Sequence, residues 1–258
     1  MLLTLLSVIL AYTAIAYVVL PAVWTHYEHQ KDLMNLPMVT RTAQGIPGDP
    51  INIGLIGDNR EVLCAMNAAG WLPADPVTFR SSIEIAGSVL LDRAYPDAPV
   101  SNLYYLGRRE DLAFEKPAGK SADRRHHVRF WKALDQGQEN RPVWLGAVTF
   151  DKGVGVSHFT GAITHHIDAD IDAERDQLAT DLEAAGMATA KYQVTGVGPT
   201  LTGRNGGGDL YVTDGEVWIL RLVEACRPQA GPVKILPSPP ATEFKDQIWR
   251  DIAEALHK

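Results

Sequence analysis

The first 27 residues contain no Asp, Glu, Lys or Arg, and this charge-free start constrains the architecture more than any other feature of the sequence. Residues 2–20 are uncharged and mostly apolar. A helix that spans a bilayer needs about 20 such residues, so the segment is long enough. Tyr17 and Trp24 lie near its C-terminal end, where interfacial aromatic side chains gather. We therefore predict a transmembrane anchor at residues 1–24, in contact with the lipid bilayer through residues 2–23.

Two other interpretations of this segment stay open. The triplet Ala14-Ile15-Ala16 has the pattern of a signal-peptide cleavage site, but no Lys or Arg precedes it and the apolar run continues beyond it. A helix buried in a soluble core is the other interpretation. Lys31 and Arg41 follow the segment, and the positive-inside rule then favours a cytoplasmic domain. Two charges do not decide the side of the membrane.

The rest of the chain has the composition of an ordinary soluble domain. All 24 basic and 31 acidic residues follow residue 27, which excludes a disordered, collagenous or multi-pass membrane protein. The net charge of −7 argues against a nucleic-acid partner, because phosphate backbones bind to basic faces. Two prolines and two glycines within residues 45–50 favour a linker or turn over helix or strand. We predict a linker at 25–50 and a globular domain at 51–258.

Helix and strand signals do not alternate regularly in the globular part. Asp58 or Asn59 caps a helix that ends at Gly70, and Asp170 caps another that ends at Gly186. Further helices are expected at residues 78–91 and 243–256, and strands at residues 51–56, 103–106, 112–115, 127–131, 143–150 and 192–197. This order predicts an α+β fold, a mixed sheet with flanking helices, preceded by one transmembrane helix.

Glycine marks two turns in the C-terminal part. Asp214-Gly215 separates two β-rich runs within residues 210–220, a pattern typical of a hairpin with a type I′ turn. The glycine-rich residues 203–209 lack the GxxxxGK[ST] pattern of a phosphate-binding loop. We therefore expect them to form a hairpin or a loop.

Cys64 and Cys226 are the only cysteines. They are far apart in the sequence, and two thiols alone cannot form a zinc site. Cys64 lies in an apolar helical stretch, so we expect it in the core. This count leaves the redox compartment open.

Five of the eight histidines cluster in the middle of the chain, the first two within the segment RRHHVRFW that begins at Arg124. In a strand, His127 and Arg129 share one face, while Val128 and Phe130 share the other. If the apolar pair points inward, His127 and Arg129 are exposed together. A guanidinium matches phosphate or carboxylate, and imidazole acts as an acid or base, so we predict anion binding by Arg124 and Arg129 and catalysis by His127. The alternative is that the arginines are solvated and one histidine is a core group.

A second group of histidines opens the segment THHIDADID at residues 164–172. Its alternating aspartates resemble a calcium-binding loop, but the glycine and glutamate that such a loop requires are missing. Asp170 is explained as a helix cap, which leaves His165, His166 and Asp168 without a structural role. Imidazole and carboxylate are ligands of Zn²⁺ and Mn²⁺, so these three are candidate ligands of a divalent metal cofactor.

Asp151 follows an apolar strand signal, a place typical of a general base, of a metal ligand and of a turn. Together the three groups predict a His/Asp/Arg site in which His127, His166 and Asp151 are catalytic. Such a site suits phosphate-ester hydrolysis, because it has a base or metal to activate water and a cation to offset negative charge. The sequence contains neither a GxSxG nor an HExxH motif.

Several segments together resemble one family, the LssY C-terminal domain family. The resemblance spans most of residues 50–195, and two His-His blocks at this separation are its most specific part. Its segments are RRHHVRFW at 124–131, THHIDADIDAER at 164–175, VWLGA at 143–147, GRREDLAF at 107–114, APVSNLY at 98–104, and the strand at 50–56 before a helix that ends in AGW at 69–71.

This resemblance implies a bacterial, membrane-associated domain of uncharacterised function, often fused to DedA or type 2 phosphatidic acid phosphatase modules. With a single hydrophobic segment, it implies a single-pass protein of the bacterial inner membrane. We expect a phosphoesterase-like hydrolase or binding domain for a phosphate-bearing, lipid-derived molecule. The alternatives are a non-enzymatic binding or assembly module of a membrane transport, secretion or envelope complex, with membrane-protein partners, and a polysaccharide-binding domain.

Overall fold

The computed structural model describes most of the chain as two compact units. One unit comprises Met1–Lys31 with Leu236–Lys258, and the other comprises Asp32–Ile235. The helix predicted at 78–91 and most of the one predicted at 243–256 lie outside the described residues. The described residues are 2–19, 22, 29–74, 103–118, 124–161, 163–194, 201–238, 240, 243–244 and 247–248.

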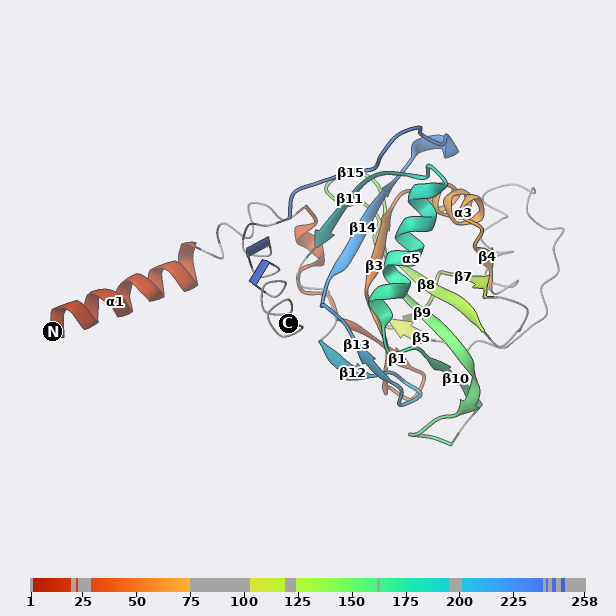
Figure 1. Ribbon diagram of the computed structural model, residues 1–258, viewed down its shortest axis with the longest axis horizontal. Helices are drawn as coiled ribbons and strands as arrows, with labels where there is room; N and C mark the ends of the chain where they lie inside the picture. Colours follow the sequence, from red (N-terminus) through yellow and green to blue (C-terminus); the bar gives the residue numbers. More distant parts are fainter. Residues whose placement is uncertain are drawn as a thin grey trace, which may run out of the picture. The chain divides into compact units, whose positions relative to one another are not determined.

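The charge-free segment forms the predicted N-terminal helix (Figure 1). Helix α1 (Leu2–Ala14) continues as the π-helical turn η1 (Ile15–Val19), and these 18 residues leave their apolar side chains exposed. Ser7 and Thr13 donate to carbonyl oxygens four residues earlier, so the helix satisfies their hydroxyls internally. The helix is long and apolar enough to cross a membrane, a property that it shares with signal sequences.

A mixed sheet forms the centre of the larger unit. Its parallel pairs are β3 with β14 and β11 with β15, and its other pairs are antiparallel. The strand order is β15 (Lys234–Ile235), β11 (Ala188–Val194), β14 (Val217–Leu222), β3 (Ile53–Ile56), β9 (Val143–Val156), β8 (Arg125–Leu134), β7 (Leu112–Pro117) and β4 (Leu72–Pro73), and β10 (Ile163–Ile167) also pairs with β9. The predicted α+β class with a mixed sheet is confirmed.

Within the described part of the chain, two helices cover one face of this sheet (Figure 1). Helix α3 (Asn59–Ala68) begins with a capping box, in which Asp58 accepts from the Glu61 amide and Glu61 accepts from the Asp58 amide. Helix α5 (Ile171–Ala184) has Asp170 as its N-cap, as predicted. The core that they share with the sheet includes Val62, Leu63, Met66, Phe114, Val128, Phe130, Trp144, Leu178, Leu182, Leu220 and Leu222.

A smaller sheet covers part of the opposite face. Its strands are β2 (Pro47–Pro50), β1 (Val39–Thr42), β5 (Leu103–Tyr105) and β6 (Arg108–Arg109), in that order. Strand β5 contacts the large sheet through Tyr105, whose ring centroid lies 5.7 Å from that of Trp131 in β8. The prediction that residues 45–50 form neither helix nor strand is wrong. The prolines at positions 47 and 50 were the reason for that prediction. They are tolerated because β2 is an edge strand, whose outward side needs no N–H donor.

The predicted hairpin across Asp214-Gly215 is also wrong. Strand β13 (Leu210–Val212) pairs with β12 (Thr202–Arg204), whereas β14 joins the large sheet between β11 and β3. Arg175 of α5 donates to both carboxylate oxygens of Asp214, at 2.8 and 3.0 Å, so this turn is held by a helix rather than by a partner strand. Residues 203–209, in contrast, do form a hairpin as expected.

A disulfide connects Cys64 in α3 to Cys226 in the 3₁₀ turn η3 (Glu224–Cys226), with 6.0 Å between the two Cα atoms. The prediction that Cys64 is a core residue is wrong, because Cys64 is only half-buried and forms a cross-link. The bond joins segments that are 162 residues apart in the sequence.

Candidate functional site

A polar cavity of about 280 Å³ lies where β8, β9 and β10 face β2, β5 and the β12–β13 turn. Hydroxyls and glycine backbone form its rim, from Thr42, Ser157, Thr160, Thr164, Gly206 and Gly207. Its charged, imidazole and amide groups are Gln44, Asp49, His127, Arg129, Asp151, His165 and Asn205. The cavity therefore draws its polar groups from five separate segments of the chain.

Strand β8 places two of the predicted residues in this cavity. Val128 and Phe130 point into the helix-covered core, so His127 and Arg129 point to the other face, as the strand alternation predicted. The expectation that His127 and Arg129 are exposed is wrong, since only 2% and 6% of their surface is accessible. The smaller sheet, which the sequence did not reveal, covers that face.

Arg129 is held by a buried ion pair with Asp49 of β2. Its Nη1 donates to Asp49 Oδ2 at 3.1 Å, and Asn205 Nδ2 donates to the other carboxylate oxygen at 3.3 Å. Burial raises the pKa of the Asp49 carboxyl, Arg129 opposes this rise, and the nearby Asp151 adds to it. Both members of this ion pair thus line the cavity.

A second buried arginine supports the floor of the site. Arg125 donates through Nε to Asp151 Oδ2 at 3.1 Å and through Nη1 to Glu115 Oε2 at 2.9 Å. Burial raises the pKa of Glu115, an effect that Arg125 opposes and Asp151 reinforces. Asp151, predicted as a catalytic carboxylate, is therefore oriented by an ion pair before any ligand enters.

His127 is the one imidazole that the described residues leave incompletely bonded in the cavity wall. Its Nε2 is buried and has no hydrogen-bond partner among them. Burial lowers the pKa of His127 well below its usual value of 6.5, and the charges of Arg129 and Arg125 lower it further. The imidazole is consequently neutral at physiological pH, and its Nε2 is a buried ring nitrogen without a hydrogen-bond partner among the described residues.

We expect this neutral histidine to make the domain sensitive to acid. Below about pH 6.5 the unfolded chain binds a proton at residue 127 that the folded chain excludes. The free energy of unfolding therefore decreases as the pH is lowered. The expected slope is up to about 1.4 kcal/mol per pH unit for this one group. Urea unfolding of the full chain and of His127→Gln between pH 5 and 7.5 measures it. The variant should gain stability relative to the natural chain as pH falls, and parallel curves would contradict the assignment.

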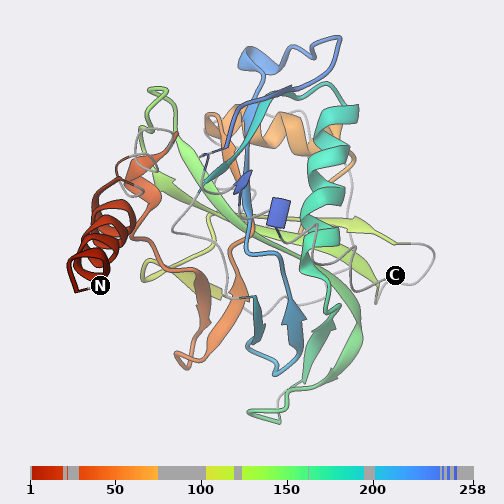
Figure 2. The same ribbon diagram turned by 60° about the vertical axis from the view of Figure 1, so that its left-hand side comes forward.

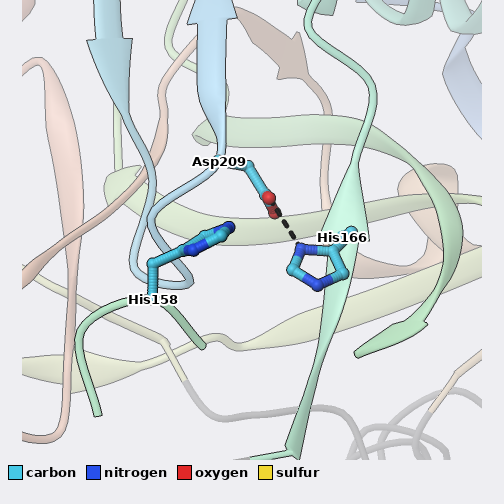
Figure 3. A group of neighbouring side chains, drawn as sticks. All are labelled: His158, His166 and Asp209. Carbon is cyan, nitrogen blue, oxygen red and sulfur yellow. Dashed lines mark hydrogen bonds and ion pairs between the residues drawn. The ribbon is translucent and has the colours of Figure 1, made fainter. Parts of the chain in front are cut away.

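Strand β10 separates the two neighbouring histidines that were predicted as metal ligands. His165 lines the cavity, whereas His166 contacts Asp209 and His158 (Figure 3). The side chain of Asp168 is about half-exposed, its Oδ2 lies 3.9 Å from Lys152 Nζ, and it does not belong to the group of potential metal ligands among the described residues. The structure thus does not bring the predicted set of three together.

His158, His166 and Asp209 form a separate cluster near the cavity rim. Their potential ligand atoms all lie within 4.8 Å of one another, and His166 Nδ1 is 2.7 Å from Asp209 Oδ1. Figures 1 and 2 show β10 beside the β12–β13 hairpin that carries Asp209. Among the described residues, these three could hold a metal ion.

Of the remaining predicted residues, Arg124 lies outside the cavity. It is exposed, and its guanidinium carbon is 5.5 Å from the ring centroid of Phe150. His127, Arg129 and Asp151 line one cavity, and His166 belongs to the neighbouring cluster.

Sequence reasoning missed four residues of these sites. Asp49 was placed in a linker, and Asn205 and Asp209 were placed in a featureless hairpin. His158 belongs to the noted cluster of five histidines, which was a usable signal. Nothing in the local sequence pairs Asp49 with Arg129, because the two lie 80 residues apart.

The fold and the cavity define an α+β domain in which a small sheet closes a polar pocket against a larger mixed sheet. The family model described as LssY C-terminus matches residues 33–217. The chain therefore belongs to the LssY C-terminus family, as the sequence resemblance predicted. No curated protein and no solved structure matches the chain.

Proposed function

We propose that the domain binds a small phosphate-bearing molecule in the cavity and hydrolyses its ester bond. The observation that carries this proposal is the buried, unpartnered Nε2 of a neutral His127 in the wall that also contains Arg129. In this mechanism Nε2 takes a proton from the attacking water, whose oxygen bonds to phosphorus as the bond from phosphorus to the ester oxygen breaks. The imidazolium then gives the proton to the departing ester oxygen, which leaves as an alcohol. Arg129 offsets the negative charge that develops on the phosphoryl oxygens.

The size and lining of the cavity favour a head group over an entire lipid. Its volume of about 280 Å³ is at the lower end of the range for small-molecule sites. The hydroxyls of Thr42, Ser157 and Thr160 suit the alcohol part of a phosphate ester. A glycerol phosphate, free or as the head of a phosphatidic acid, has the required chemistry.

We also propose that Leu2–Val19 anchors the domain in a bacterial inner membrane as a single-pass helix. The support is the length and apolar character of this helix, together with the membrane association of the resembling family. Such an anchor would keep the cavity close to lipid-derived substrates.

Binding is tested with the full chain in detergent micelles, by calorimetry with inorganic phosphate, glycerol 1-phosphate and phosphatidic acid. We expect His127→Gln to weaken binding at least tenfold, about 1.4 kcal/mol, because it removes the free imidazole nitrogen. The matched control is His126→Gln, since His126 is the adjacent residue of β8 and contacts Glu174 on the helix-covered face. Binding by glycerol 1-phosphate identifies the soluble source, and binding by phosphatidic acid alone identifies the lipid.

Hydrolysis is tested by phosphate release from the ligand that binds best. Release that is lost in His127→Gln but kept in His126→Gln supports the mechanism. If none of the three compounds binds, the proposal is overturned and the alternative of a non-enzymatic assembly module is favoured. Binding without release contradicts the hydrolytic step.

A further inference from the structure

We propose that His158, His166 and Asp209 bind a divalent transition-metal ion, with zinc as the representative ion. Two imidazoles and one carboxylate are a ligand set of catalytic zinc sites, which keep a fourth position for water or substrate. The ligand atoms lie within 4.8 Å of one another, so a single ion reaches all three after small side-chain movements. This proposal does not rest on the proposed phosphate chemistry.

One hydrogen bond holds the carboxylate of Asp209 and another holds its main chain. The amide of Ile167 donates to Asp209 Oδ2 at 3.1 Å, and the amide of Asp209 donates to Asn205 Oδ1 at 2.9 Å. Asp209 Oδ1 is thereby directed at His166 Nδ1, as Figure 3 shows. A metal ligand needs this kind of support, because an oriented group loses less entropy when the ion binds.

Glycines give both imidazole rings their positions. A Cβ atom at residue 155 would lie 2.2 Å from His166 Nε2, and one at residue 208 would lie 2.6 Å from His158 Cβ. Gly208 also has φ +92°, a conformation that favours glycine. The amide of His158 donates to the Gly207 carbonyl at 2.8 Å, which ties the histidine loop to the hairpin that carries Asp209.

The metal would take the place of the hydrogen bond between His166 and Asp209. At 2.7 Å their nitrogen and oxygen are at hydrogen-bond distance, and a zinc ion between them requires about 2.0–2.2 Å to each atom. The pair must therefore open slightly, and the ring nitrogen that binds the ion must present its lone pair instead of a hydrogen. His158 is exposed and supplies the third ligand from the solvent side, so the ion has a route to the site.

Metal binding is measured with the full chain in detergent micelles, purified through a tag without histidine and stripped with a chelator. We expect one equivalent of Zn²⁺ by dialysis and elemental analysis, and visible absorption bands of tetrahedral or five-coordinate Co²⁺ after cobalt substitution. The variant His158→Ala should weaken zinc binding at least tenfold. Because His158 is exposed, this variant should unfold at the same temperature as the natural chain when both are metal-free.

The matched control is His165→Ala, which removes the neighbouring histidine that lines the cavity. It should retain the zinc. Loss of zinc from His165→Ala with retention in His158→Ala would place the ion in the cavity and overturn the proposal. Zinc binding that is absent, or unchanged by His158→Ala, would also overturn it. None of these readouts uses a phosphate ligand, so they are independent of the binding and hydrolysis experiments.

Discussion

Replacing Arg129 by methionine is expected to lower the free energy of unfolding by about 3–5 kcal/mol. The substitution keeps much of the side-chain volume but removes the charge that pairs with Asp49 at 3.1 Å. The carboxylate is then left buried, and the neutral amide of Asn205 donates to it at 3.3 Å. Desolvating a charge without a partner costs more than losing the Coulomb attraction alone. Urea unfolding of the full chain at neutral pH measures the loss.

A double-mutant cycle separates this electrostatic effect from lost packing. Asp49→Asn combined with Arg129→Met removes both charges, so the pair of substitutions should cost clearly less than the sum of the two single ones. Arg108→Met is the surface control, since Arg108 pairs with Asp111 at 2.9 Å but has 43% of its side chain exposed. It should cost less than about 1 kcal/mol. Additive costs in the cycle would show that the Arg129–Asp49 contact does not stabilise the fold.

Removing the disulfide is expected to have the other large effect, a loss of about 2–5 kcal/mol. The bond closes a loop of 162 residues, and such a long loop has much conformational freedom in the unfolded chain that the cross-link removes. The double variant Cys64→Ser with Cys226→Ser should therefore unfold at lower urea concentration than the oxidised chain. Dithiothreitol should shift the natural chain by a similar amount and leave the double variant unchanged. A natural chain that is insensitive to reduction would contradict a stabilising bond.

The same bond bears on the side of the membrane. Structural disulfides persist in oxidising compartments and are rare in the cytosol, so, if the proposed anchor holds, we expect the domain to lie on the side of the membrane away from the cytoplasm. This expectation is opposite to that of the positive-inside rule, which, from Lys31 and Arg41, weakly favours a cytoplasmic domain. In membranes isolated from cells under thiol-blocking conditions, the chain should be membrane-bound, with Cys64 and Cys226 protected from maleimide. Free thiols would contradict the external location, and a chain in the soluble fraction would contradict the anchor.

Local patterns were sufficient for the elements that depend on neighbouring residues. The capping box of Asp58 and Glu61, the cap at Asp170 and the alternation along β8 are contacts or periodicities within a few residues. They therefore appear directly in the sequence. Local patterns gave a wrong prediction at Asp214-Gly215, where a hairpin was expected. The two flanking runs have high strand propensity, but each pairs with another strand. Strand pairing is decided by which partners are available across the whole domain.

In the candidate site, too, local patterns predicted some features and the packing of distant segments decided the others. Sequence reasoning placed His127 and Arg129 on one face of a strand, where the structure has them. It placed Asp151 at the end of the next strand, which is wrong, because β9 continues to Val156 and Asp151 lies within it, paired with Arg125 and Ile167. Whether that face is solvated or covered depends on β2 and β5, which reach it from distant parts of the chain.

Burial is therefore what changes the chemistry of these residues. A solvated His127 would titrate normally, whereas the covered one is neutral with an unpartnered nitrogen. The apolar N-terminal helix, the α+β class and the family follow from residue order, because periodicity and composition are local properties. The buried Asp49–Arg129 pair and the His158–His166–Asp209 cluster arise only when distant segments pack, because no local signal encodes a contact across 80 or 43 residues.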